Sequence, residues 1–106
     1  MGLLDLLFNG KKKREAVKHA LQNGAKVIDV RTAGEYKSGH YDGAINIPLD
    51  KIAANTKKIS GYNSAIVVYC ASGMRSAAAA RILKTNGIEA YNGKTMYNVH
   101  NLATDN

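Results

Sequence analysis

The one cysteine of the chain, Cys70, lies where an apolar segment passes into a sequence of high helical propensity. Residues 65–69 read Ala-Ile-Val-Val-Tyr, and residues 76–83, after a short turn, are rich in alanine. A thiol at such a strand-to-helix junction lies near several backbone N–H groups and the positive end of a helix dipole. Both favour the thiolate, which is the nucleophilic form of cysteine. The position of Cys70 therefore predicts a reactive thiol.

The turn at residues 70–75, Cys-Ala-Ser-Gly-Met-Arg, adds two features that favour an anion. Gly73 permits backbone angles that other residues rarely adopt. Arg75 brings a positive charge, which lowers the pKa of a nearby thiol. A buried cysteine that only fills space in the core is the alternative, since free cysteines are among the most buried residues. The glycine and the arginine in the same turn favour the reactive interpretation.

The size and composition indicate one globular domain. A chain of 106 residues can form a single hydrophobic core but not two. Hydrophobic residues make up 45% of the sequence, and one proline without low-complexity stretches argues against disorder. A single cysteine allows no internal disulfide, which is typical of a reducing compartment. Sulfur or redox chemistry at Cys70 would therefore need a second molecule to complete it.

The net charge of +7 is unevenly distributed. The sequence has no acidic residue between Asp50 and Glu89. Six basic residues fall in that interval: Lys51, Lys57, Lys58, Arg75, Arg81 and Lys84. Their field would attract small anions to Cys70 and favour its thiolate. Nucleic-acid binding is the competing explanation of the basic balance. The only dense basic run is residues 11–14, without an aromatic-rich basic motif, so we expect no nucleic-acid partner.

The N-terminal segment combines an apolar stretch at residues 3–8 with the basic run at 11–14. This order is the reverse of that in a secretory signal peptide, and no stretch approaches the roughly 18 apolar residues of a membrane span. We expect a cytoplasmic protein with an apolar and basic extension at residues 1–13 and one domain at residues 14–106. Packing of the apolar residues against the domain is the expected role, and docking to an anionic membrane surface or a partner is the alternative.

Helical and extended patterns alternate along the chain. The expected helices are residues 12–23, 35–38, 49–59, 76–85 and 96–102, and the expected strands are 26–30, 44–47, 65–69 and 88–91. Strands separated by helices predict an α/β fold with a central parallel sheet and helices on both faces. Ligands in such folds bind at the carboxyl ends of the strands, which is where Cys70 lies.

Two separate motifs, in a fixed order, carry a resemblance to a known family. Residues 29–48 contain Asp-Val-Arg, Glu-Tyr, Gly-His, Gly-Ala and Asn-Ile-Pro, and residues 70–75 fit Cys-x-x-Gly-x-Arg. Over roughly residues 14–103 the sequence resembles the rhodanese homology domain. The resemblance implies a single rhodanese-like domain that acts as a sulfurtransferase without a cofactor.

In this family the cysteine takes a sulfane sulfur from a donor such as thiosulfate and becomes a persulfide. The resemblance gives that catalytic role to Cys70, with a thiol, cyanide or a protein as the sulfur acceptor. The substrate-binding residues would be those of the loop: Ala71, Ser72, Gly73, Met74, Arg75 and Ser76. Arg75 would bind the donor or steady the loop. Asp29, Arg31 and Glu35 are expected to support the loop from beneath as a charged network, outside the chemistry.

Two other functions are open. A cysteine phosphatase of related fold has five residues between its cysteine and arginine, whereas this loop has four, and no carboxylic acid follows it to protonate a leaving group. A non-catalytic rhodanese-like module, acting as a sulfur carrier or protein-binding domain, usually lacks the cysteine that this chain keeps. Both are less favoured than the sulfurtransferase.

The sequence departs from the family after its last strand. Where the family often has Gly-Gly and a tryptophan four residues on, this chain has Asn92-Gly93 and Tyr97. We expect this change to alter packing at the rim of the site. His19, His40 and His100 are scattered, so we expect no metal site, and we expect His40 to pin its turn by a local hydrogen bond.

Overall fold

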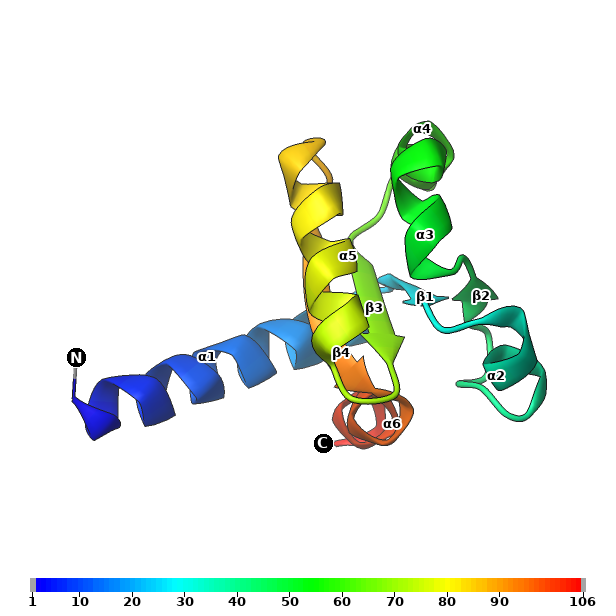
Figure 1. Ribbon diagram of the computed structural model, residues 1–106. Coiled ribbons are helices and arrows are strands. Elements are labelled where there is room, and N and C mark those ends of the chain that lie inside the picture. The colour runs from blue at the N-terminus through cyan, green and yellow to red at the C-terminus, as the bar shows by residue number, and fades with distance from the viewer. Residues whose placement is uncertain (1, 106) are drawn as a thin grey trace.

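The structure, a computed structural model, describes residues 2–105, and for residues 3–8 it describes the backbone alone. Helices and strands alternate along the chain, as the sequence patterns predict (Figure 1). The elements in order are α1 (Leu3–Gln22), β1 (Lys26–Asp29), α2 (Ala33–Lys37), β2 (Ile45–Asn46), α3 (Leu49–Ile52), η1 (Ala53–Asn55), α4 (Thr56–Ser60), β3 (Ile66–Cys70), α5 (Met74–Thr85), β4 (Ala90–Thr95) and α6 (Met96–Thr104).

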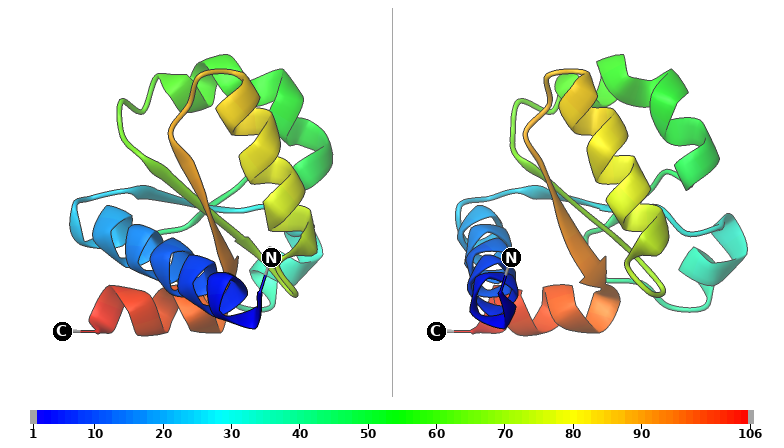
Figure 2. Two further views of the ribbon diagram at one scale, coloured as in Figure 1. Left: turned by 90° about the vertical axis from the view of Figure 1, so that its left-hand side faces the viewer. Right: turned by 60° about the vertical axis from the view of Figure 1, so that its left-hand side comes forward.

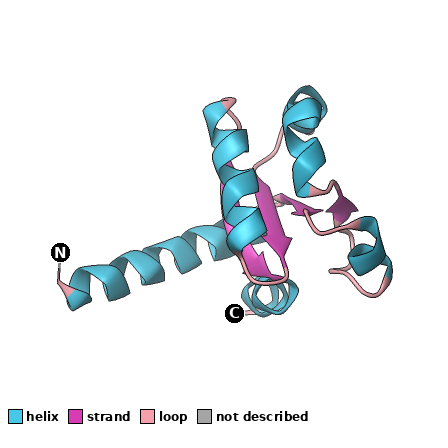
Figure 3. Cartoon of the chain, in the orientation of Figure 1, coloured by secondary structure: helices cyan, strands magenta, loops and turns pink. Residues whose placement is uncertain are grey.

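The four strands form one parallel sheet in the order β2-β1-β3-β4 (Figure 3). Every residue of β3 is buried, because this central strand is covered on both faces. Asp29 at the end of β1 lies opposite Tyr69, and Cys70 at the end of β3 lies opposite Thr95 of β4. The carboxyl ends of three strands therefore meet at one edge of the sheet.

Helices cover both faces of the sheet (Figure 2). One core cluster joins α3, α4 and α5 to the side chains of Val68 and Cys70. The other joins α1 and α6 to Val67 and Tyr69, the alternate residues of the same strand. The predicted fold class, an α/β domain with a central parallel sheet covered on both faces, is confirmed. The alternation places the thiol of Cys70 on the α5 side.

The helix expected at residues 49–59 and the strand expected at residues 88–91 both differ from the structure. The single helix expected at residues 49–59 is divided into α3, η1 and α4. Asn55 leaves the helical region, with φ −114° and ψ 14°, and its side-chain amide donates to the carbonyl of Lys51 at 2.8 Å. Asparagine competes in this way with the backbone hydrogen bonds of a helix. The last strand occupies residues 90–95 instead of 88–91, because its polar residues pair with β3 around a bulge.

Helix α1 begins at Leu3, well before the expected start at residue 12, and so includes the basic run. Its second half packs on α6 through buried Val17 and Ala20, whereas its first half extends away from the sheet in Figure 1. The side chains of residues 3–8 lie outside those described, so their packing and the domain boundary after residue 13 stay predictions. Within residues 2–105, the structure has no helix of the length and apolarity that spanning a membrane requires.

Candidate active site

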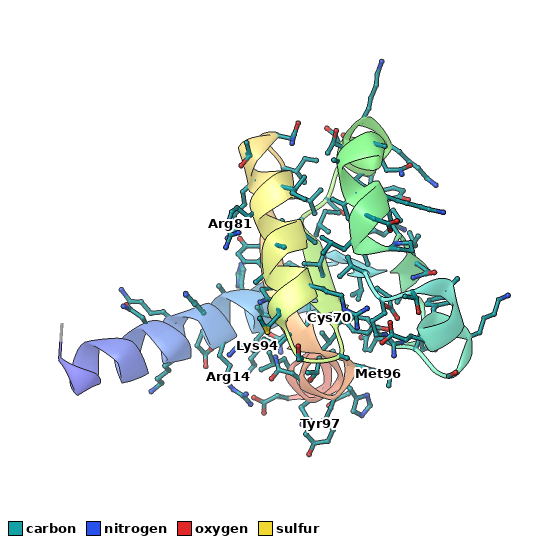
Figure 4. All side chains as sticks on the ribbon, viewed as in Figure 1. Arg14, Cys70, Arg81, Lys94, Met96 and Tyr97 are labelled. Atoms are coloured by element: carbon teal, nitrogen blue, oxygen red, sulfur yellow. The ribbon has the colours of Figure 1, made fainter. Side chains whose placement is uncertain are left out.

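Cys70 ends β3, and its side chain lies inside the turn that leads to α5 (Figure 4). The residue is only 1% exposed. Its Sγ accepts hydrogen bonds from the backbone amides of Gly73 at 3.0 Å and Ser76 at 3.4 Å. The hydroxyl oxygen of Ser76 lies 3.4 Å from the same sulfur. The loop therefore wraps round the sulfur with donors, as the sequence predicts.

Gly73 makes this wrapping possible. Its φ of 98° lies in the left-handed region, and a Cβ there would lie 3.4 Å from the Cβ of Lys94. A side chain would thus be strained at this position because of its φ, although its Cβ would only come into ordinary van der Waals contact with β4. Gly73 also caps α5, since its carbonyl accepts from the amide of Ala77 at 3.0 Å. The twelve-residue helix α5 therefore directs its N-terminus at the sulfur.

The loop makes the thiol acidic. Burial alone raises the pKa of the Cys70 thiol, but hydrogen bonds from the Ser76 hydroxyl and from the amides of Ser76, Ser72 and Gly73 lower this pKa overall, to about 7. A free thiol titrates near 8.5. A substantial fraction of Cys70 is therefore thiolate at neutral pH, which is the state that a nucleophile or a sulfur acceptor needs.

Arg75 pairs with a carboxylate of the first motif. Its Nη1 and Nη2 donate to the two carboxylate oxygens of Glu35 at 2.8 and 2.9 Å. This pair lowers the pKa of Glu35 to about 2, with help from the backbone amide of Thr32. Both side chains are about one-third exposed, at 36% and 35%. Arg75 thus links the active loop to α2, and its side chain stays partly exposed to solvent.

Asp29 and Arg31 form a second charged group on the other face of the sheet. Asp29 is 0% exposed, and its oxygens accept from Nε of Arg31 at 3.0 Å, from Nη2 of Arg31 at 2.6 Å and from the hydroxyl of Tyr69 at 2.7 Å. Nη2 of Arg31 also donates to the carbonyl of Gly39 at 2.6 Å. These contacts fix the end of β1 to β3, next to Cys70, and to the loop after α2.

The structure therefore divides the three residues predicted to support the loop. Glu35 contacts the loop directly through Arg75, whereas Asp29 forms a hydrogen bond with Tyr69, the neighbour of Cys70. Nδ1 of His40 donates to the carbonyl of Tyr36 at 2.8 Å, and the His40 ring stacks on the Tyr36 ring. Among the residues with described side chains, no cluster of His, Cys, Asp or Glu could hold a metal ion.

For one polar residue at the site, Asn92, the sequence predicts only altered packing at the rim. Its Oδ1 lies 2.6 Å from the Ser76 hydroxyl, and its Nδ2 donates to the carbonyl of Gly73 at 3.1 Å. The signal that could have indicated its role is its place at the carboxyl end of the last strand, where parallel strands present ligand-binding groups.

The rim of the site is apolar and exposed. Met74 in the loop is 80% exposed, and Tyr97, at the position of the family's tryptophan, is 76% exposed. Tyr97 and Met96 line an open hollow of about 490 Å³ together with His40, Tyr41, Asp42 and His100. A second hollow of about 320 Å³ includes Arg75. Figure 4 shows Met96 and Tyr97 at the start of α6, directly beyond the loop that holds Cys70.

The fold, the cysteine loop and its acidic thiol together define a class of protein. Residues 13–104 match the family described as the Rhodanese-like domain. The chain therefore belongs to the rhodanese-like domain family.

Several curated relatives are similar in sequence. YqhL of Bacillus subtilis, an uncharacterized protein, is 39% identical over 71 residues, which is 66% of this chain and 56% of YqhL. A tRNA sulfurtransferase of Thermoplasma acidophilum is 35% identical over 77 residues, 72% of this chain and 15% of that protein. The thiosulfate sulfurtransferase PspE of Escherichia coli is 38% identical over 61 residues, 57% of this chain and 59% of PspE. The chain thus spans less than two thirds of each relative.

Solved structures agree. A rhodanese with anions from E. coli has a TM-score of 0.64 at 31% identity, over 71% of this chain and 91% of that one. A rhodanese-like domain protein from Staphylococcus aureus has a TM-score of 0.66 at 31% identity, over 81% and 85% of the two chains. The similarity covers most of each of these structures.

Proposed function

We propose that this protein is a sulfurtransferase that carries a sulfane sulfur on Cys70. The observation that supports this most is the Sγ of Cys70 at the N-terminus of α5, with amides of Gly73 and Ser76 directed at it and a pKa of about 7. Family membership and the sulfurtransferase names of relatives support sulfur transfer in general. The choice of thiosulfate as donor is our proposal.

The reaction has two steps at one sulfur. In the first, the Cys70 thiolate attacks the outer sulfur of thiosulfate, an S–S bond forms to Sγ, and sulfite leaves with the electron pair of the bond that breaks. In the second, a thiolate or cyanide attacks the outer sulfur of the Cys70 persulfide, and the Cys70 thiolate leaves. Between the two steps, the outer sulfur of the Cys70 persulfide bears a negative charge. The backbone amides of residues 71–76 would stabilise this charge.

The substrates follow from the surroundings of the loop. A small dianion such as thiosulfate suits the basic interval between Asp50 and Glu89 and the partly exposed side chain of Arg75. The exposed apolar rim of Met74 and Tyr97 suits the approach of a thiol-bearing acceptor, either small or on a protein. The sequence has one cysteine, so the persulfide has no second thiol in the chain to resolve it. In a reducing cytoplasm, a thiol of another molecule would take that role.

Intact-mass spectrometry tests this proposal. After reduced protein is treated with thiosulfate and desalted, we expect a product heavier by one sulfur atom, and we expect cyanide to remove that sulfur as thiocyanate. Cys70→Ser is the matched control and should gain no mass. A wild-type protein that gains no sulfur from thiosulfate or from a small-molecule persulfide would overturn the proposal and favour a non-catalytic binding module.

A further inference from the structure

The hydroxyl of Ser76 lies near three acceptors that compete for its single proton: Oδ1 of Asn92, Sγ of Cys70 and, at 3.5 Å, the carbonyl oxygen of Lys94. Ser76 is 0% exposed, so the protein has to supply its hydrogen-bond partners. Its Oγ lies 3.4 Å from Sγ of Cys70 and 2.6 Å from Oδ1 of Asn92. A hydroxyl donates one hydrogen bond at a time. When Cys70 is a thiol, its S–H can donate to Ser76 while Ser76 donates to Asn92. When Cys70 is a thiolate, the sulfur has no proton to donate and instead accepts a hydrogen bond from the Ser76 hydroxyl.

Asn92 is held so that its Oδ1 still has a hydrogen-bond donor when the Ser76 hydroxyl turns away from it. Gly93 is the extra residue of a bulge in β4, because Val68 pairs with Asn92 and Tyr69 with Lys94. Lys94 then takes a φ of 71°, and its amide donates to Oδ1 of Asn92 at 2.9 Å. The Nδ2 of Asn92 donates to the carbonyl of Gly73 at 3.1 Å. These two backbone contacts fix which end of the amide faces Ser76.

We propose that Asn92 is a positioning residue that shares the Ser76 hydroxyl with Cys70 and exchanges it during each turnover. With the thiol, the hydroxyl points to Asn92. With the thiolate, the hydroxyl turns to Sγ, and Oδ1 of Asn92 keeps the amide of Lys94. With the persulfide, the negative charge moves to the outer sulfur, and the hydroxyl returns to Asn92. The movement is a rotation of the hydroxyl hydrogen about the Cβ–Oγ bond with the O–H bond intact, and the proton of the thiol passes to solvent when the thiolate forms.

The consequence is a thiolate that is stable but still nucleophilic. Competition from Asn92 weakens the hydrogen bond from Ser76 to the thiolate, and so limits the fall in the pKa of Cys70. Thiols with a pKa near the ambient pH are the best attacking groups, because a further fall in pKa reduces the nucleophilicity of the thiolate. Glycine, the residue that the family often has here, could not compete in this way.

Other charges face the thiol, and they stay constant in the test. Arg75 lies close enough on α5 that the charge of the Cys70 thiolate raises its pKa, after the larger effect of Glu35. Lys94 on β4 lies against Gly73 of the loop. Asp29 and Arg31 bond to Tyr69 on the opposite face of the sheet. Substitution of Asn92, an uncharged residue, by an apolar one leaves the number of these charges unchanged.

A double-mutant cycle tests the proposal, with the pH midpoint of iodoacetamide alkylation as the readout. We expect Asn92→Leu to lower the thiol pKa by about half a unit to one unit, the effect of one hydrogen bond. The same substitution in a Ser76→Ala background should leave the midpoint of that background unchanged, because the hydroxyl that carries the effect is gone. Asn92→Gly should match Asn92→Leu, and it serves in place of it if leucine prevents folding.

Asn86→Leu is the matched control. This residue donates its side-chain amide to the carbonyl of Ile82 at 2.8 Å near the far end of α5, so its loss should not change the thiol midpoint. A midpoint for Asn92→Leu and Asn92→Gly that is unchanged or raised, or a fall that persists without Ser76, would overturn the role of Asn92.

The inference rests on the proposed function for its place in a catalytic cycle, but alkylation needs no sulfur donor. A wild-type thiol with a midpoint near 7 that accepts no sulfur would overturn the proposed function alone. The variants would then still decide whether Asn92 acts on Cys70 through Ser76.

Discussion

Two strand-to-helix junctions at the same edge of the sheet use their polar groups in opposite ways. After β1, the buried carboxylate of Asp29 is bound by Arg31 and Tyr69, so its acceptors are used within the chain. After β3, the amides of Gly73 and Ser76 are directed at a sulfur that can change its bonding partner. Position at the carboxyl end of a strand is therefore not enough to make a reactive site. The donors also have to face a group that can react.

The two junctions meet at one ion pair. Glu35 of α2 belongs to the first and Arg75 of α5 to the second, and they bond in a bidentate arrangement. Glu35 is itself fixed by Thr32, whose hydroxyl accepts from the Glu35 amide while the Thr32 amide donates to the Glu35 carboxylate. Such a capping box orients a helix terminus. The junction after β1 can thus hold the junction after β3 in place through this ion pair, in addition to the contacts of Tyr69.

The largest expected effect comes from Cys70→Ser, which removes the only sulfur that the proposed reaction can use. Serine is nearly isosteric, so we expect the fold to persist, but it cannot form a persulfide. Thiocyanate production from thiosulfate and cyanide should fall to background, while circular dichroism and the Tm stay close to those of the wild type. Sulfur transfer at wild-type rates by Cys70→Ser would contradict the assignment of the chemistry to the junction after β3.

Asp29→Ala should act on stability instead of chemistry. Removal of one partner from a buried ion pair leaves the other charge uncompensated, and we expect a loss of about 3–5 kcal/mol in the free energy of unfolding. Urea denaturation measures this loss. Asp50→Ala, at an exposed aspartate in the first turn of α3, is the control and should cost far less. An equal cost for both variants would show that the Asp29 network does not support the fold.

The sequence predicts the sheet and the cysteine loop because both depend on local patterns. Apolar runs mark β1 and β3, and their alternation with helices is enough to predict parallel pairing. The place of Cys70 at the end of a strand follows from residues next to it in the chain. The match to β3 is within one residue at each end, 65–69 expected and 66–70 observed.

What the sequence does not predict depends on contacts between distant residues. Glu35 and Arg75 are separated by 40 positions, and Ser76 and Asn92 by 16. Spacing along the chain does not indicate that these side chains meet. β4 is polar in sequence and forms a strand only because β3 pairs with it, and the bulge at Gly93 turns Asn92 toward the loop. At Gly93 a Cβ would lie 2.7 Å from a methyl group of Val99, so only glycine fits.

The junction after β3 should also make the stability of the protein depend on pH, because it stabilises the thiolate of Cys70. The pKa of Cys70 is lowered to about 7 in the folded chain, below that of an unfolded thiol near 8.5. The thiolate therefore contributes stability that is complete above the unfolded pKa and is lost as the pH falls through 7. We expect the stability of the wild type relative to Cys70→Ser to rise by about 2 kcal/mol between pH 6 and pH 9. A constant difference in urea denaturation across this range would show that the loop does not stabilise the thiolate.

The smallest expected effect on the fold comes from Glu35→Gln, which breaks the link between the junctions. The pair is partly exposed, so solvent screens it, and we expect a fall in Tm of about 3 °C or less. Arg75→Ala removes the same ion pair and in addition the positive charge near the sulfur. Comparison of the two variants therefore separates the loop-steadying role of Arg75 from its role in binding an anion.

If Arg75 binds thiosulfate, its removal should lower kcat/KM for thiosulfate by roughly tenfold to a hundredfold, since a charge-assisted contact to an anion is lost. Glu35→Gln should keep most of the wild-type value, because the guanidinium remains and is no longer neutralised by a carboxylate. The cyanide step, measured on protein already loaded with sulfur, should be little changed in both variants. If Glu35→Gln lowered kcat/KM as much as Arg75→Ala, the guanidinium would act by steadying the loop, and the junction after β1 would control the junction after β3 through this ion pair.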